Sequence, residues 1–362
     1  MGSVTSSPEV SYSAIAAKLA EGVRIGQEEA RWLWLNASDA ELRSLASTVR
    51  GRFHAPGSCT YMVMRIVNYT NVCVAQCDYC AFYRLPGQEG GYVLSHEEVF
   101  SKLDELLTLG GDLAAFNGGF NPHLPLDYYC ELFAAIRAHY GERLEFYALT
   151  IAEFMYLADH AKLNYAEAAS RLKAAGVRWI TGGGSEILTE DFRRRHSKFK
   201  YTVREYFTAQ RAILDAGLKT TATMVIGFDE TLDERLEHLE RTRQFQDETR
   251  GLASFLCWTY KPYFTQMGGI EITTAEYLRH LALARIYLDN IPRIRTSVLT
   301  QNQQALEGLN YGADDFDLPI EDEVTQKAGA TISLDFERIL GYARELGFAP
   351  VYRHVAGVST HF

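Results

Sequence analysis

The most constraining feature of the sequence is a group of three closely spaced cysteines, Cys73, Cys77 and Cys80. Thiols at this spacing reach three corners of a cubane iron-sulfur cluster from one short loop, because thiolates are the soft ligands that such clusters take. A structural zinc site is the alternative, but the chain has no second CxxC pair and no HxxxH pair to complete one. The spacing therefore favours a [4Fe-4S] cluster with three protein ligands and one open iron.

The residues around the cysteines, from Asn68-Tyr-Thr-Asn-Val-Cys73 to Ala81-Phe-Tyr-Arg84, resemble the radical S-adenosylmethionine (SAM) superfamily. Within it they are most similar to the dehypoxanthine futalosine cyclases, with the aminofutalosine and deazaflavin synthases as near relatives. Further matches are Gly182-Gly-Gly-Ser-Glu186, Thr220-Thr-Ala-Thr-Met224, Glu230-Thr231, Glu237-His238-Leu239, Gln246-Asp-Glu-Thr249 and Trp258-Thr259. The resemblance implies that the open iron chelates SAM, whose reductive cleavage gives a 5′-deoxyadenosyl radical, and that a flavodoxin or ferredoxin supplies the electron.

Composition and charge restrict the other classes of function. The 362 residues are 47% hydrophobic and 23% charged, as in an ordinary globular protein long enough for one barrel-sized domain. A net charge of -10 argues against nucleic acid as a partner. The chain has no apolar run long enough to predict a membrane helix and no secretory signal pattern at its start. With three of six cysteines assigned to an oxygen-sensitive cluster, we expect a cytoplasmic protein.

From residue 60 onward, strand patterns alternate with amphipathic helical patterns. We expect strands at residues 61–67, 112–116, 144–149, 178–181, 220–226, 253–258, 295–299 and 309–311. Strands separated by helices predict an α/β fold of parallel βαβ units that close into a (β/α)8 TIM-like barrel, with a partial barrel of six strands as the alternative. We expect residues 1–59 to form a helical extension packed against a barrel end, with 1–10 disordered. Residues 60–330 would form the barrel, and 331–362 a C-terminal helix and tail that close it.

Active residues of such a barrel lie at the C-terminal ends of its strands, where the connecting loops share one rim. The resemblance assigns cofactor binding to several residues there: Tyr79, Asn117, Gly118, Gly119, Ser185, Glu186, Arg194 and Met224. The glycines would let the backbone approach the methionine amino group, and Glu186 would accept hydrogen bonds from the ribose hydroxyls or that amino group. Arg194 represents three consecutive arginines, one of which would pair with the cofactor carboxylate. A plain turn at 117–119, a solvated helix face at 193–195 and a core position for Met224 are the alternatives.

Several departures from the resembled branch fall where the barrel rim should face the substrate. Its members carry His-Ala-Phe-Ser-Pro-Pro-Glu where this chain has Tyr147-Ala-Leu-Thr-Ile-Ala-Glu153, and Gly-His-x-Glu-Thr where it has Gly227-Phe228-Asp229-Glu230-Thr231. A usual Pro-Trp-Thr becomes Cys257-Trp258-Thr259, and Gly-Thr-Met-Met after the last strand becomes Asp317-Leu-Pro-Ile320. These changes indicate that the cofactor machinery is kept while the substrate shell is altered.

Three residues in these segments are candidate catalytic groups. Glu153 and Asp229 are candidates for a general base. Cys257 is a candidate to return a hydrogen atom to a substrate radical, because a thiol S–H bond is weak. The alternative for Cys257 is a buried free cysteine that only packs in the core.

Three functions remain open from the sequence. By the resemblance, the leading one is abstraction of hydrogen from C4′ of a nucleoside-like substrate, followed by attack of the sugar radical on the attached benzoate ring in menaquinone biosynthesis. The second is a divergent relative that acts on another nucleoside or sugar, for example by epimerising or rearranging it in secondary metabolism. The third, of another class, is a binding or electron-transfer protein with a structural cluster, against which the open iron speaks.

Overall fold

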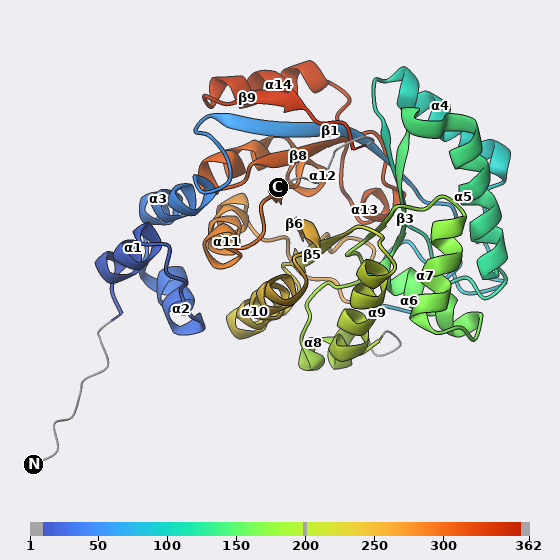
Figure 1. Cartoon of the computed structure of the whole chain (residues 1–362), viewed down its shortest axis with the longest axis horizontal. Helices are drawn as coiled ribbons and strands as arrows, with labels where there is room; N and C mark the ends of the chain where they lie inside the picture. Colours follow the sequence, from blue (N-terminus) through green and yellow to red (C-terminus); the bar gives the residue numbers. More distant parts are fainter. Residues whose placement is uncertain (1–9, 198–200, 356–362) are drawn as a thin grey trace, which may run out of the picture.

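Parallel strands form the centre of the computed structural model, which describes residues 10–197 and 201–355 (Figure 1). The strands are β1 (Ser58–Val67), β2 (Leu113–Phe116), β3 (Glu145–Thr150), β4 (Trp179–Thr181), β5 (Thr220–Ile226), β6 (Leu252–Thr259), β7 (Ile294–Thr296) and β8 (Asp315–Pro319). They pair in the order β4-β3-β2-β1-β8-β7-β6-β5. A parallel bridge from Trp179 to Lys219 joins the two ends, so the barrel is nearly closed. The predicted TIM-like barrel is therefore confirmed.

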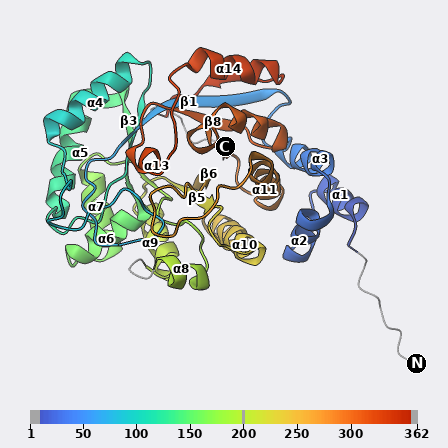
Figure 2. The ribbon, with the colours of Figure 1, turned by 180° about the vertical axis from the view of Figure 1, so that it is seen from behind.

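Helices surround the barrel on its outer side. Seen from both directions, α4 to α7 lie on one flank, with α10 and α11 on the other (Figure 1, Figure 2). The helices are α4 (His96–Thr108), α5 (Leu126–Tyr140), η1 (Gly141–Arg143), α6 (Ile151–His160), α7 (Tyr165–Ala174), α8 (Glu190–His196), α9 (Val203–Asp215), α10 (Leu232–Thr249), α11 (Thr274–Tyr287), α12 (Val298–Gln301), η2 (Asn302–Tyr311) and α13 (Glu323–Lys327).

A recurring local signal starts these helices: a Ser, Thr or Asn caps the first turn and a glutamate three residues later bonds back to the cap. This capping box begins α4, α6, α7, α9 and α10. Each of these helices therefore has a defined first residue, and in α4, α6 and α10 this residue ends the connection that follows a strand.

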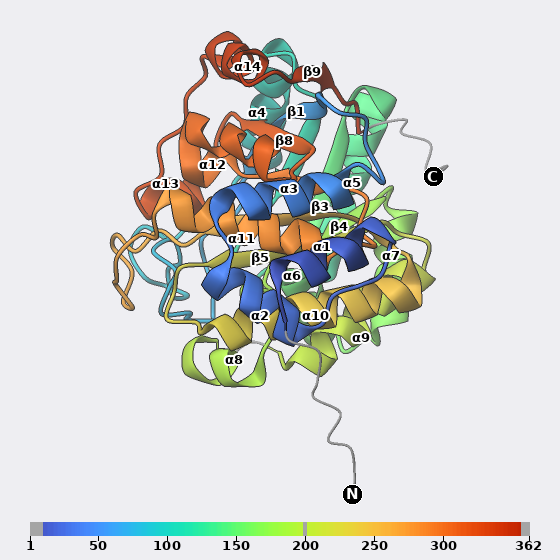
Figure 3. The same ribbon diagram turned by 90° about the vertical axis from the view of Figure 1, so that its left-hand side faces the viewer.

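The N-terminal extension consists of α1 (Tyr12–Ala20), α2 (Gln27–Asn36) and α3 (Asp39–Arg50). These helices lie against α10 and α11 on the outside of the barrel (Figure 3). Only the end of α3 reaches the barrel's N-terminal face, where the Arg50 guanidinium donates to the carbonyls of Ser58 and Ala313. Disorder was expected for residues 1–10, and all of these except Val10 lie outside the described ranges.

The C-terminal segment adds α14 (Phe336–Glu345) and β9 (Ala349–Tyr352). β9 pairs in parallel with the first half of β1, off the barrel path. The predicted C-terminal helix is therefore present, and the segment after it joins the sheet beside β1.

The position of the eighth strand was predicted wrongly. Residues 309–311 belong to the 3-10 helix η2, and β8 instead spans Asp315–Pro319. Its two aspartates, Asp315 and Asp317, are fully buried inside the barrel against arginines, and this polar pattern does not resemble an apolar strand. Asp317 to Pro319, expected after the last strand, are therefore part of it. The seventh strand is also shorter than expected, because α12 begins at Val298.

Candidate active site

A cavity of about 300 Å³ opens at the C-terminal ends of the strands and extends into the barrel. Ten of the residues predicted from the sequence line it: Cys73, Cys77, Tyr79, Cys80, Asn117, Gly118, Gly119, Glu153, Ser185 and Glu186. They come from the loops that follow β1, β2 and β4 and from the start of α6, so segments more than a hundred residues apart converge on one space. The rim expected of a parallel barrel is therefore where these groups meet.

The cysteine loop after β1 is held by main-chain hydrogen bonds to three other segments. The Cys73 amide donates to the Arg84 carbonyl at 2.9 Å, and Val74 donates to Phe120 at 3.1 Å. From the loop after β6, Met267 donates to the Asp78 carbonyl at 2.9 Å. These contacts fix a loop that has no regular secondary structure of its own.

The chemistry of the three thiols fits an iron-sulfur cluster. None is in a disulfide, all face the same cavity, and the Ala75 amide donates to Cys73 Sγ at 3.4 Å, as amides do to cluster thiolates. Burial and the neighbouring Cys77 raise the pKa of the Cys80 thiol to about 12, although amides of Phe82 and Tyr83 oppose the rise. A thiolate there therefore needs a positive partner such as cluster iron.

A site for a single metal ion would need a different geometry from that of an iron-sulfur cluster. Within the described ranges, no three His, Cys, Asp or Glu side chains are arranged to hold one metal ion. A cubane takes each thiolate on a separate iron, so its ligands stand around a larger space.

The loop at 117–119 packs directly on the cysteine loop. A Cβ on Gly119 would lie 2.2 Å from the Val72 carbonyl oxygen and 2.7 Å from Cys73 Cβ, and a Cβ on Gly118 would lie 2.6 Å from the Tyr69 ring. These glycines are required for close packing as well as for any approach of the cofactor. Because Gly119 touches the segment that carries the first cysteine, the two loops form one unit.

Glu153 joins this unit to the start of α6. Its Oε1 accepts hydrogen bonds from the Tyr69 hydroxyl and, at 2.8 Å, from the Gly118 amide, while Oε2 accepts from the amide and hydroxyl of Thr150 at 2.9 and 2.6 Å. Burial raises the pKa of Glu153, although these hydrogen bonds oppose the rise. Both oxygens are occupied by protein donors, so the geometry favours a positioning role over the predicted role of general base.

The segment after β4 approaches the cavity through its glycines. A Cβ on Gly184, whose φ is +85°, would lie 2.2 Å from Ala152 Cβ, and one on Gly183 would lie 2.5 Å from Thr150. Ser185 is held to β5 by its hydroxyl, which lies 2.7 Å from the Thr223 carbonyl. Glu186 lines the cavity in a backbone conformation with φ of 40°, which is uncommon for a residue other than glycine.

An aromatic group covers the same side of the cavity. The Tyr79 hydroxyl lies 2.9 Å from the Ser197 hydroxyl, and the Tyr79 ring centroid is 5.3 Å from that of Phe228. Phe228 in turn lies 4.5 Å from Tyr260, centroid to centroid. These rings form an apolar wall of the cavity, and an apolar surrounding suits redox chemistry.

Two of the predicted site residues lie on the other face of their strands. Cys257 is fully buried and packs with the apolar core between the barrel and its helices, whereas its neighbours Leu256 and Trp258 line the cavity. Met224 is likewise fully buried in that outer core. Successive side chains of a strand point to opposite faces, so neither residue reaches the cavity. Burial raises the pKa of the Cys257 thiol, as expected for a packed cysteine.

Two more predicted residues lie outside the cavity lining. The side chain of Arg194 is 73% exposed and pairs with Asp191 on the same helix, so it lies on the solvated face that was its alternative. Asp229 is half exposed and accepts from Arg195 at 3.1 Å and from His196 at 2.8 Å. Burial tends to raise the pKa of Asp229, but these two partners lower it below its ordinary value. A carboxylate stabilised in this way is a poor general base.

The structure also places in the cavity residues that were not predicted as catalytic or cofactor-binding groups. Arg295 on β7 and Asp317 on β8 lie inside the barrel, with Nη2 of Arg295 2.9 Å from Oδ1 of Asp317. Asp322, Lys261 and Trp258 line the cavity as well. Arg295 could have been predicted from its position, because it is a charged residue inside a predicted strand. Such a side chain is buried only when it has a partner. Tyr147, Phe228 and Asp317, which depart from the resembled branch, all line the cavity.

With this geometry in hand, comparison with known proteins identifies the family. A model described as the radical SAM superfamily matches residues 67–242, and one described as the CofH/MqnC C-terminal region matches residues 249–357. Cyclic dehypoxanthine futalosine synthase of Halalkalibacterium halodurans is 35% identical over 95% of this chain and 94% of that protein. Aminodeoxyfutalosine synthase of Thermus thermophilus is 35% identical over 87% of this chain and 86% of that protein.

The chain therefore belongs to the radical SAM superfamily, and its C-terminal part is of the CofH/MqnC type. It is an enzyme, which sets aside the alternative of a purely structural or electron-carrying cluster. The family implies a [4Fe-4S] cluster and SAM. The solved structure of methylornithine synthase (PylB) supports the fold, with a TM-score of 0.71, 15% identity and coverage of 93% of this chain and 97% of that one.

No helix in the described part of the chain combines the length and the apolar character needed to cross a bilayer.

Proposed function

We propose that this enzyme cyclises a nucleoside-like substrate by removing hydrogen from its ribose, with dehypoxanthine futalosine as the substrate. The observation that carries the proposal is the full-length similarity to a cyclic dehypoxanthine futalosine synthase, combined with the convergence of the cysteine loop and the glycine loops on one cavity. A flavodoxin or ferredoxin is the proposed reductant.

The proposed roles divide the cavity into two parts. Cys73, Cys77 and Cys80 would hold the cluster, and the loops at 117–119 and 182–186 would bind the methionine and ribose parts of SAM. When bound, the cluster and SAM supply a 5′-deoxyadenosyl radical. The protein's own contribution is to position the substrate sugar against the cofactor and to exclude water, which the rings of Tyr79, Phe228 and Tyr260 support.

Anaerobic turnover of the reconstituted enzyme with SAM, dithionite and dehypoxanthine futalosine tests this function. We expect a product two hydrogens lighter than the substrate, formed together with 5′-deoxyadenosine. Cys80→Ala should abolish both products. Cys130→Ala is the matched control, because Cys130 is a free cysteine on α5 outside the cavity lining, and it should retain both products. 5′-Deoxyadenosine with unchanged dehypoxanthine futalosine would contradict the proposed substrate.

A second candidate is a related reaction on another nucleoside or sugar. It is favoured by one specific observation, since Tyr147, Phe228 and Asp317 differ from the resembled branch and all three side chains border the cavity. A redox-neutral reaction such as epimerisation would leave the substrate mass unchanged in ordinary water and place solvent deuterium on carbon in D2O. Mass spectrometry of the recovered substrate therefore separates the two candidates.

A further inference from the structure

Arg295 lies at the floor of the cavity with part of its guanidinium unused. The side chain is 5% exposed, and Nη2 donates to Asp317 Oδ1 at 2.9 Å, while Nε is 3.5 Å from Asp315 Oδ2. Nη1 has no hydrogen-bond partner among the described residues, and it is not one of the fully enclosed polar atoms, so this end is open to the cavity. Arginine presents its donors as a planar fork that matches a carboxylate.

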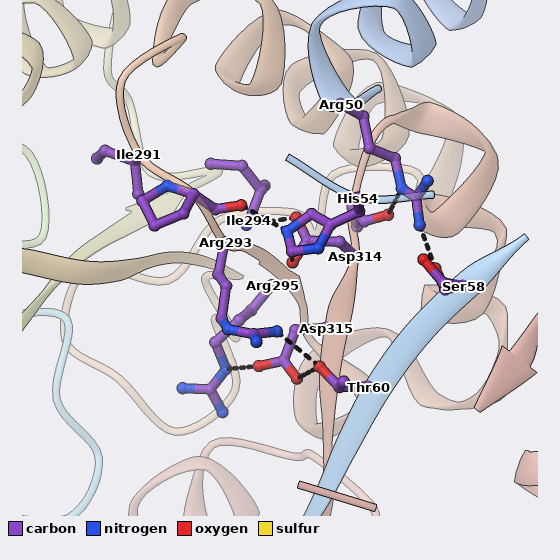
Figure 4. A network of polar contacts seen from close by, with 12 residues as sticks. Arg50, His54, Ser58, Thr60, Ile291, Arg293, Ile294, Arg295, Asp314 and Asp315 are labelled. Atoms are coloured by element: carbon purple, nitrogen blue, oxygen red, sulfur yellow. Dashed lines mark hydrogen bonds and ion pairs between the residues drawn. The ribbon is translucent and has the colours of Figure 1, made fainter. Parts of the chain in front are cut away.

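Arg295 belongs to a network of arginines and aspartates inside the barrel. Arg353 pairs with Asp315 at 2.6 Å. Arg293 donates to the Thr60 hydroxyl at 2.9 Å, and that hydroxyl donates to Asp315 (Figure 4). Two guanidinium groups, those of Arg295 and Arg353, thus pair directly with the carboxyl groups of Asp315 and Asp317, and Arg293 reaches Asp315 only through Thr60.

Asp315 and Asp317 are not equivalent. For Asp315, burial opposes ionisation, but the arginines, Arg353 first, lower its pKa below the ordinary value. Burial and the neighbouring Asp315 raise the pKa of Asp317, despite Arg295. Asp315 lies closer to Arg353, at 2.6 Å, than to Arg295, at 3.5 Å, so Asp317 is the main partner of Arg295, and Nη1 of Arg295 stays available to the cavity.

The surroundings of Arg295 make its unpaired Nη1 donors costly. Met64, Tyr147 and Leu299 belong to the apolar cluster inside the barrel and border the same cavity. A guanidinium in an apolar site is stabilised strongly by a charged acceptor. Unpaired guanidinium donors in this apolar setting therefore favour a charged acceptor over a neutral one.

We propose that Arg295 binds a carboxylate of the substrate at the floor of the cavity, and that Asp317 holds its guanidinium in place. The identity of the molecule that carries the carboxylate rests on the proposed function. In dehypoxanthine futalosine, the benzoate group supplies this carboxylate. Asp317 is also one of the departures from the resembled branch.

The test uses reconstituted enzyme with SAM, titrated in a calorimeter with 3-methylbenzoate and with the neutral isostere 3-methylbenzamide. We expect the wild type to prefer the benzoate by about 10- to 100-fold, the range for a hydrogen bond to a charged group. Arg295→Gln should bind both probes equally weakly, and Arg295→Lys should keep only part of the preference. Arg293→Gln is the control and should retain it, since Arg293 does not line the cavity.

If Arg295→Gln does not fold, judged by cluster absorbance and circular dichroism, Arg295→Gln with Asp317→Asn removes both charges and replaces it. A wild type without benzoate preference, or a preference that survives loss of Arg295, overturns the subsite. The proposed function is tested separately. If benzoate is preferred through Arg295 but dehypoxanthine futalosine is not turned over, the subsite is supported and only the proposed substrate is refuted. Turnover with a KM that does not change in Arg295→Gln refutes the subsite and leaves the function standing.

Discussion

Replacing Glu153 by glutamine tests whether this residue positions the cofactor loops or acts as a base. The carboxylate accepts hydrogen bonds from Tyr69 and the Gly118 amide on one oxygen, and from the amide and hydroxyl of Thr150 on the other. A glutamine side chain fits the same space but turns one acceptor into a donor. Whichever way the amide is oriented, its NH2 faces the backbone N–H of either Gly118 or Thr150.

The expected loss of stability follows from the backbone donor that is left without an acceptor. Leaving one buried donor without an acceptor costs roughly 1–3 kcal/mol, and the remaining bonds weaken because the acceptor is no longer charged. We therefore expect the free energy of unfolding of Glu153→Gln to fall by about 2–4 kcal/mol. Because the Gly118 amide belongs to the loop packed on Cys73, the dissociation constant of SAM should rise as well.

Anaerobic urea unfolding of the reconstituted protein, followed by circular dichroism, measures the loss of stability, and equilibrium binding measures the affinity for SAM. Glu205→Gln is the matched control, because Glu205 accepts the same two hydrogen bonds from Thr202 in the capping box of α9 but is exposed and contacts no loop of the site. It should cost about 1 kcal/mol or less. A Glu153→Gln enzyme with unchanged stability and SAM affinity but no turnover would refute the positioning role and restore the general base.

Three further changes have defined outcomes. Gly119→Ala should reduce cluster content after reconstitution, measured as iron per chain, because its Cβ would overlap the segment of the first cysteine, whereas Gly341→Ala, with open space around its Cβ, should leave the content unchanged. Burial holds the pKa of His238 at about 3 and that of His280 well below its ordinary value, so unfolding takes up protons below about pH 6.5. The free energy of unfolding should therefore decrease as the pH is lowered, by about 2 kcal/mol from pH 6.5 to 5.5. Urea titrations should show a smaller decrease after both histidines are replaced by glutamine. Cys257→Ala should keep kcat within about twofold, because the thiol packs outside the barrel, and a complete loss of turnover in a stably folded variant would contradict that placement.

The barrel could be predicted from sequence because its strands are apolar and its helices begin with recognisable caps. β8 could not, since its inward residues Asp315 and Asp317 are stabilised by Arg295 and Arg353 from β7 and from the segment after β9. A polar strand is stable only when distant partners are present, and a single sequence does not show which partners those are.

The cysteine loop was predictable because all three cysteines lie within eight consecutive residues. The direction of individual side chains was not. Cys257 and Trp258 are adjacent in β6, yet only Trp258 faces the cavity, and a shift of one residue in the assumed alternation exchanges their roles. The segment that carries Cys257 was located correctly, while the face of the strand required the structure.

On the proposed function, the arrangement of contacts would let the barrel keep its radical chemistry while the residues around the substrate differ. The cofactor loops are fixed by groups that the protein itself supplies, such as the Glu153 carboxylate on the Gly118 amide, so their geometry does not depend on the substrate. Tyr147, Arg295 and Asp317 instead lie deeper, on β3, β7 and β8, where they border the cavity without bonding to those loops. A substitution at the floor therefore alters which molecule is held, and leaves the parts that generate the radical in place. If so, Arg295→Gln should change substrate preference and Glu153→Gln should change SAM affinity, with little coupling between the two in the double variant.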